Sequence, residues 1–133
     1  MTDGKPIFTY NWVGLEKYHI ASAQKISAGP HTLKFNFEYA GGRGGAGTAT
    51  ISVDGKKIAA GNILHTNGNT FGIDESADVG EDQNTPVDPV YNHKSKFTGK
   101  ISKVTIETKP TVLSEADKAE LKKQQDEAAA LRE

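Results

Sequence analysis

A concentration of carboxylates between residues 74 and 88 is the feature of the sequence best suited to chemistry. Six acidic side chains fall in a segment with no lysine or arginine between Lys57 and Lys94. Calcium binds through several hard oxygen ligands, which a curled loop can supply. We therefore predict a calcium site with the ligands Asp74, Asp78, Glu81 and Asp82. The spacing does not fit an EF-hand, and a recognition loop or a solvated acidic connection would have the same composition.

A glycine-rich stretch, Gly41 to Gly47, carries a single cation, Arg43. Exposed backbone N–H groups beside a guanidinium can hold sulfate or phosphate, so Arg43 is a candidate anion-binding residue. The pattern matches neither a P-loop nor a dinucleotide-binding fingerprint, because a strand is expected after it instead of a helix. A flexible hairpin loop explains the glycines equally well.

The four histidines, His19, His31, His65 and His93, are scattered along the chain. No pair has the spacing of zinc ligands on a helix or strand, which argues against a zinc site. A Ser-His-Asp arrangement stays open, because such triads are recognised by geometry and not by order in the chain. No G-x-S-x-G elbow is present to support one.

Aromatic residues gather near the N-terminus and could stack on a sugar. Tyr10, Trp12 and Tyr18 are the candidate carbohydrate-binding residues, with Phe8 beside them. The same rings would also supply much of the buried area of a small β-domain, so packing in the core is the alternative.

Length and composition limit the classes of function. A chain of 133 residues suits one domain, and 14 glycines with 5 prolines indicate many turns. The net charge of −1 gives no reason to expect nucleic acid or an anionic membrane as partner. The absence of cysteine excludes disulfides, thiolate metal sites and a cysteine nucleophile. No apolar run approaches the roughly 20 residues of a membrane span, and no signal-peptide core follows Met1.

Alternating apolar and polar residues predict the strands that position these groups. The clearest case is His31 to Tyr39, where four apolar side chains alternate with polar ones. Asp54-Gly55 predicts a tight hairpin turn between two of the strands. The expected strands are Pro6–Trp12, Tyr18–Ala21, His31–Tyr39, Thr48–Val53, Lys56–Ile63, Thr70–Ile73 and Lys100–Thr108.

The composition changes after Pro110, where alanine, glutamate, lysine and glutamine dominate. Ser114 followed by Asp117 is typical of a capping box, so a helix is expected from Ser114 to the C-terminus. We predict a β-domain over residues 1–109, then a linker and helix over 110–133. The fold class is mainly β: an antiparallel β-sandwich of jelly-roll or lectin-like type with one C-terminal α-helix, the alternative being a partly open barrel.

Five segments in order resemble the C-terminal accessory domain of long bacterial arylsulfatases. They are D-G-K-P-I-F-T-Y-N-W-V-G-L-E (Asp3–Glu16), A-G-P-H-T-L-K-F-N-F-E-Y (Ala28–Tyr39), S-V-D-G-K-K-I-A (Ser52–Ala59), D-E-S-A-D-V-G-E-D-Q-N-T-P-V (Asp74–Val87) and F-T-G-K-I-S-K-V-T-I (Phe97–Ile106). The likeness spans about Asp3 to Glu107, and the helix resembles the tail that usually follows. In that family this region is a non-catalytic domain behind the catalytic one.

The resemblance implies a fold and a context but no catalytic residue. The family's nucleophile is a formylglycine made from the first residue of a C/S-x-P-x-R motif, and this chain has neither a cysteine nor such a serine. We therefore expect no enzyme activity of its own. The expected role is to pack on or assemble with a sulfatase catalytic domain; the alternative is a stand-alone module that binds carbohydrate, such as a sulfated glycan.

The family's domain starts upstream of the segment that resembles Asp3, so we expect an open sheet edge that pairs with a second copy. No cofactor is expected apart from calcium. The compartment is undetermined, although a periplasmic or secreted location would follow if the parent protein carries a signal peptide.

Overall fold

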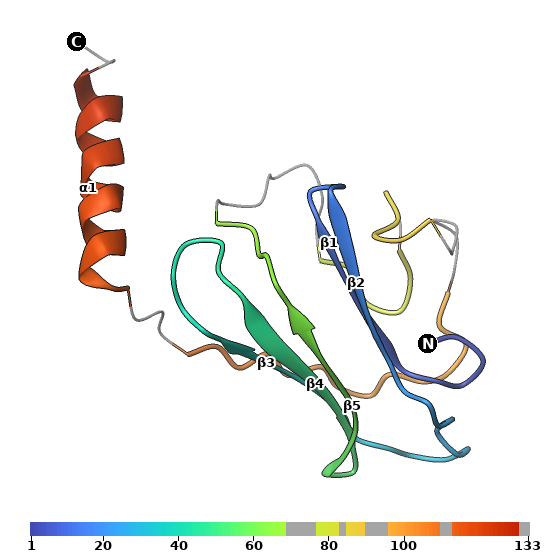
Figure 1. Ribbon diagram of the computed structural model, residues 1–133. Coiled ribbons are helices and arrows are strands. Elements are labelled where there is room, and N and C mark those ends of the chain that lie inside the picture. The colour runs from blue at the N-terminus through green and yellow to red at the C-terminus, as the bar shows by residue number, and fades with distance from the viewer. Residues whose placement is uncertain (69–76, 83–84, 90–95, 110–112, 131–133) are drawn as a thin grey trace.

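The computed structural model describes residues 1–68, 77–82, 85–89, 96–109 and 113–130 of the chain (Figure 1). Within these ranges five strands precede one helix, which confirms the prediction of a mainly β chain with a C-terminal helix. The elements are β1 (Ile7–Trp12), β2 (Glu16–Ala21), β3 (Leu33–Tyr39), β4 (Gly47–Val53), β5 (Lys56–Ile63) and α1 (Glu115–Ala130).

The strands form two antiparallel sheets, β1-β2 and β3-β4-β5. Each strand pairs with its neighbour in sequence. The turn between β4 and β5 is Asp54-Gly55, with φ angles of 50° and 81°. Positive φ at both positions is what the predicted tight hairpin turn requires.

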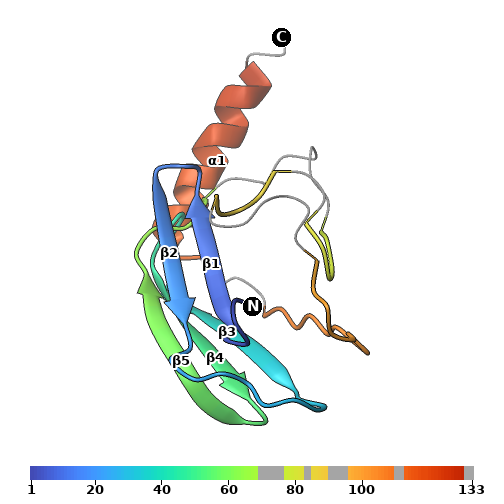
Figure 2. The ribbon, with the colours of Figure 1, turned by 90° about the vertical axis from the view of Figure 1, so that its right-hand side faces the viewer.

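The core lies between the two sheets, and its fully buried apolar members are Ile20, Ala49, Ile51 and Ile63. Alternation along β2, β4 and β5 puts these side chains on the inner faces, whereas several apolar side chains of β3 stay exposed. Phe8 of β1 stacks on Phe35 of β3, with ring centroids 3.9 Å apart. Figure 2 shows the two-stranded sheet lying over the three-stranded one. The result is a small sandwich-like arrangement that is not closed.

The helix α1 begins where the capping signal predicts. The Ser114 hydroxyl accepts a hydrogen bond from the N–H of Asp117 at 3.1 Å, and the Asp117 carboxylate accepts one from the N–H of Ser114 at 3.1 Å. This reciprocal pair satisfies two backbone donors that the first turn leaves free. The helix projects beyond the end of the sheets in both views (Figures 1 and 2). No helix in the described ranges has the length and apolar character of a membrane span.

One predicted strand is wrong. In residues 100–108, Ile101, Val104 and Ile106 are expected near a single face with one irregularity around Ser102, yet the chain there has no regular secondary structure. A strand satisfies its backbone groups through a neighbouring strand, and the described residues offer none to this segment. The strand predicted at Thr70–Ile73 lies outside the described residues.

Candidate functional site

The three aromatic residues proposed to bind sugar face inward at one end of β1 and β2. Tyr10 and Tyr18 are cross-strand partners, with ring centroids 6.4 Å apart. The Tyr10 hydroxyl accepts a hydrogen bond from the N–H of Asn67 at 2.7 Å. Trp12 stacks on His65, with ring centroids 4.7 Å apart, so one face of its indole is covered. The structure therefore brings these rings together as half-buried packing residues.

A polar cluster completes this end of the hairpin. The Tyr18 hydroxyl donates to the Glu16 carboxylate and accepts from the N–H of His65 at 3.1 Å. Nδ1 of His65 lies 2.9 Å from Oε2 of Glu16. Hydrogen bonds from Tyr18 and then His65 lower the pKa of Glu16, whereas desolvation and then Glu16 raise the pKa of Tyr18. At neutral pH the carboxylate is thus ionised and the phenol protonated. These states favour the hydrogen bonds that link β2 to the segment after β5.

Arg43 is one of the residues that line a hollow of about 400 Å³ between the glycine-rich loop and α1. Its Nε donates to the carbonyl of Gly68 at 2.8 Å. The carboxylates of Asp117 and Glu120 line the same hollow. The Ser114 hydroxyl, followed by the Ser114 N–H, lowers the pKa of Asp117, which is therefore an anion at neutral pH. Two carboxylates beside one guanidinium give little support to an anion site.

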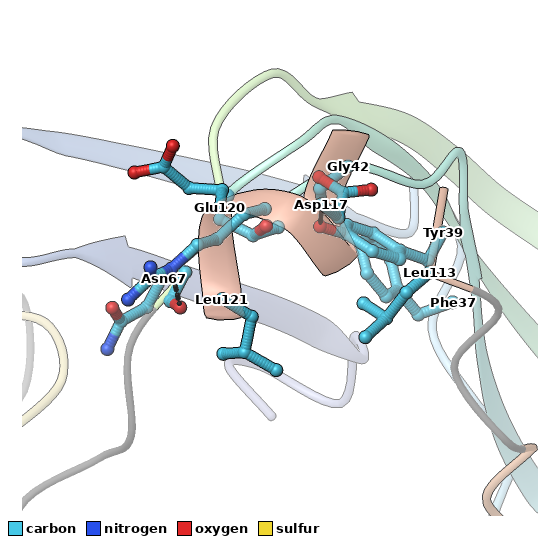
Figure 3. Close-up of a pocket in the computed structure, with 12 residues that line it drawn as sticks. Phe37, Tyr39, Gly42, Asn67, Leu113, Asp117, Glu120 and Leu121 are labelled. Atoms are coloured by element: carbon cyan, nitrogen blue, oxygen red, sulfur yellow. Dashed lines mark hydrogen bonds between the residues drawn. The ribbon is translucent and has the colours of Figure 1, made fainter. Parts of the chain in front are cut away.

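Apolar side chains line much of the rest of this hollow. Figure 3 shows Phe37, Tyr39 and Leu113 lying together at one side, with Leu121 of α1 between them and Asn67. The hollow under the first turns of α1 therefore combines apolar side chains with the charged groups of Arg43, Asp117 and Glu120.

The acidic segment is described in part. Asp78, Glu81 and Asp82 lie within it, whereas Asp74 falls outside the described residues. Glu81 forms an ion pair with Lys96, with Oε2 and Nζ 2.5 Å apart. Where the chain is described, no group of three or more His, Cys, Asp or Glu side chains could hold a metal ion. Calcium binding stays a prediction.

Part of the same segment packs on the outer face of the β1-β2 hairpin. Asn11 donates to the carbonyl of Val87 at 3.1 Å. Asp88 is 5% exposed, and its Oδ2 lies 3.2 Å from Nδ1 of His19. Its burial beside a histidine gives Asp88 a structural role that the acidic composition of the loop did not reveal.

An exposed apolar surface runs through the segment Phe97–Ile106, named here the docking stretch. Its large apolar side chains are 44 to 81% exposed: Phe97, Ile101, Val104 and Ile106. Leu33 and Phe35 of β3 are exposed as well, at 50 and 43%. Contiguous exposed apolar residues on a small domain mark surfaces that contact other molecules.

Sequence reasoning missed several polar residues that the fold assembles. Glu16 and His65 meet across 49 positions, and His31 and Asp54 across 23, with Nδ1 and Oδ2 of the latter pair 2.7 Å apart. Ser27 joins the second pair. The Glu16–His65 and His31–Asp54 contacts form only when the chain folds. Ser27 and His31, by contrast, are close in sequence around a Gly-Pro turn.

Comparison with protein-family models, with curated proteins and with solved structures finds no match for this chain. The likeness to arylsulfatase accessory domains therefore stays a prediction from the five sequence segments.

Proposed function

We propose that this chain is an accessory module that docks on a larger folded protein and does not itself cleave sulfate esters. The observation that carries the proposal is the docking stretch, whose large apolar side chains are 44 to 81% exposed and which has no strand partner among the described residues. Such a segment is stabilised by a neighbouring protein that covers its apolar side chains and supplies hydrogen-bond partners for its backbone. The resemblance suggests the catalytic domain of an arylsulfatase-like protein as that neighbour.

The size of the apolar surface fits a docking role. Burying a half-exposed large apolar side chain contributes roughly 1 kcal/mol, so four of them contribute on the order of 4 kcal/mol. That free energy corresponds to a change of about 100- to 1,000-fold in a dissociation constant. The docking stretch could thus decide whether a complex forms.

Carbohydrate binding, the alternative role, has weaker support. A sugar platform needs aromatic faces open to solvent, but Trp12 is stacked on His65 and the hydroxyls of Tyr10 and Tyr18 are engaged within the chain. These contacts favour a packing role for the three rings.

Binding to a sulfatase catalytic domain tests the proposal. The partner is the catalytic domain of a long bacterial arylsulfatase prepared without its own C-terminal domain, and association is measured by calorimetry. The variant Ile101→Lys/Val104→Lys/Ile106→Lys places charges on the apolar positions and should weaken binding by at least about 100-fold. The matched control, Thr98→Lys/Ser102→Lys/Thr105→Lys, adds the same three charges to exposed polar positions of the same stretch and should bind like the wild type.

Three results would overturn the proposal. One is the absence of binding by the wild-type chain. Another is equal weakening by the two variants, which would indicate an effect of charge alone. The third is sedimentation as a dimer that the apolar variant dissociates, which would assign the surface to a second copy of the chain.

A further inference from the structure

Three side chains from two segments converge at the Asp54-Gly55 turn of the three-stranded sheet. The Ser27 hydroxyl oxygen lies 3.0 Å from Nε2 of His31, and Nδ1 of His31 lies 2.7 Å from Oδ2 of Asp54. Serine, histidine and carboxylate are therefore joined in a row through opposite nitrogens of one imidazole. This is the order of contacts that a serine nucleophile, its general base and the group orienting that base require.

The backbone around the turn holds the carboxylate in place. The N–H of Thr32 donates to Oδ1 of Asp54 at 2.8 Å, and the N–H of Asp54 donates to the carbonyl of Thr32 at 2.9 Å. Both carboxylate oxygens are thus engaged, one by the backbone and one by His31. The orientation of the imidazole is therefore fixed by the Asp54-Gly55 turn and its backbone contacts with Thr32.

The charge on Asp54 sets the direction of the hydrogen bonds. The side chain of His31 and then the N–H of Thr32 lower the pKa of Asp54, which is ionised at neutral pH. An anion beside Nδ1 favours the tautomer that carries its proton there. Nε2 then has a lone pair directed at the Ser27 hydroxyl and can accept its proton.

The other two histidines with described side-chain contacts lack this arrangement. Thr9 and Asp88 both approach Nδ1 of His19, and Tyr18 and Glu16 both approach Nδ1 of His65. A base that uses one nitrogen for both partners cannot take a proton at one end while being oriented at the other. Geometry thus singles out His31.

A small hollow of about 170 Å³ lies beside the row. Ser27 and His31 line it with the apolar side chains of Ile26, Val53 and Ile58, and two cations, Lys25 and Lys56, line it as well. Its volume suits a short acyl group, and the ammonium groups favour one that carries a carboxylate.

We propose that Ser27 and His31, oriented by Asp54, form a nucleophilic site that hydrolyses small acyl esters, with a preference for anionic acyl groups. The Ser27 oxygen bonds to the acyl carbon while its proton passes to His31, and the ester C–O bond breaks as that proton passes to the leaving alkoxide. Water then attacks the acyl-serine, gives a proton to His31 and releases the acid, and Ser27 recovers its proton. The activity is independent of the docking role, because it uses no residue of the docking stretch.

Covalent labelling tests the site directly. The full chain is treated with an alkyl fluorophosphonate, and the labelled residue is located by mass spectrometry; hydrolysis of 4-nitrophenyl acetate and of mono-4-nitrophenyl succinate is followed in parallel. We expect the label on Ser27 and faster turnover of the succinate. Ser27→Ala and His31→Gln should abolish both readouts, whereas His19→Gln, which removes a histidine paired with another carboxylate, should leave them unchanged.

Asp54 is a positioning residue, and Asp54→Asn tests it. Asparagine tolerates the positive φ of this turn, so circular dichroism should show an intact fold. The amide no longer favours the proton on Nδ1, so labelling should slow by at least about 100-fold and its dependence on pH should change. Absence of label on Ser27 in the wild-type chain, or labelling that persists in His31→Gln, would overturn the proposal.

Discussion

Replacement of Ile63 by alanine tests the core most sharply. Ile63 is 1% exposed and is the largest fully buried side chain among the described residues. Truncating a buried isoleucine costs about 2–5 kcal/mol, because the transfer free energy is lost and a cavity remains. With four buried apolar residues among the described residues, the core has little material to close that cavity, so we expect a value of about 3 kcal/mol.

The matched control is Ile106→Ala, which removes the same atoms from a side chain that is 81% exposed. An exposed position of this kind changes stability by no more than about 0.5 kcal/mol. For a chain of this size about 1 kcal/mol moves the unfolding midpoint by roughly 3–5 °C. Calorimetry should therefore show a fall of about 10 °C for Ile63→Ala and almost none for the control.

Similar small shifts in both variants would show that Ile63 does not anchor a cooperative core. A large shift for Ile106→Ala would show that the docking stretch is already covered in the isolated chain, which would contradict the basis of the docking proposal.

Three further results are expected. Gly61→Ala should lower stability by about 1–3 kcal/mol in urea unfolding, because the added Cβ would lie 2.8 Å from Cγ1 of Ile20, and an unchanged midpoint would refute this contact between the sheets. Stability should fall on acidification, because hydrogen bonds lower the pKa of Glu16 from 4.5 and that of Asp54 from 3.8 in the folded chain. Their contribution to the free energy of unfolding is complete above about pH 4.5 and disappears as the pH falls through the lowered pKa values of the folded state. Acid unfolding curves without such a slope would contradict this prediction. Deletion of residues 114–133 should lower the melting temperature by less than about 10 °C, since α1 has no broad apolar stripe, and a larger drop would place the helix in the core.

Local signals in the sequence predict the local structure well. The alternation in β3, the Asp54-Gly55 turn and the Ser114 cap each act over fewer than ten residues, and the structure contains all three. The strand prediction fails at residues 100–108 because the pattern records which side chains are apolar and not whether a partner strand is present.

The polar clusters could not be predicted in the same way. Glu16 meets His65, and His31 meets Asp54, only after strands have paired and the sheets have packed. The type and number of titratable residues were visible in the sequence, but the choice of ring nitrogen, which distinguishes His31 from His19, is a property of the folded geometry.

The pairing of every strand with its neighbour in sequence has a consequence for how the chain folds. Loop closure between adjacent strands costs little entropy, so the β3-β4-β5 meander can form rapidly from its two turns before any distant contact is made. The β1-β2 hairpin has its own ladder but needs the meander to cover its apolar face. It can therefore detach as a unit while the meander stays intact, and amide hydrogens of the central strand β4 should be the last to exchange with solvent.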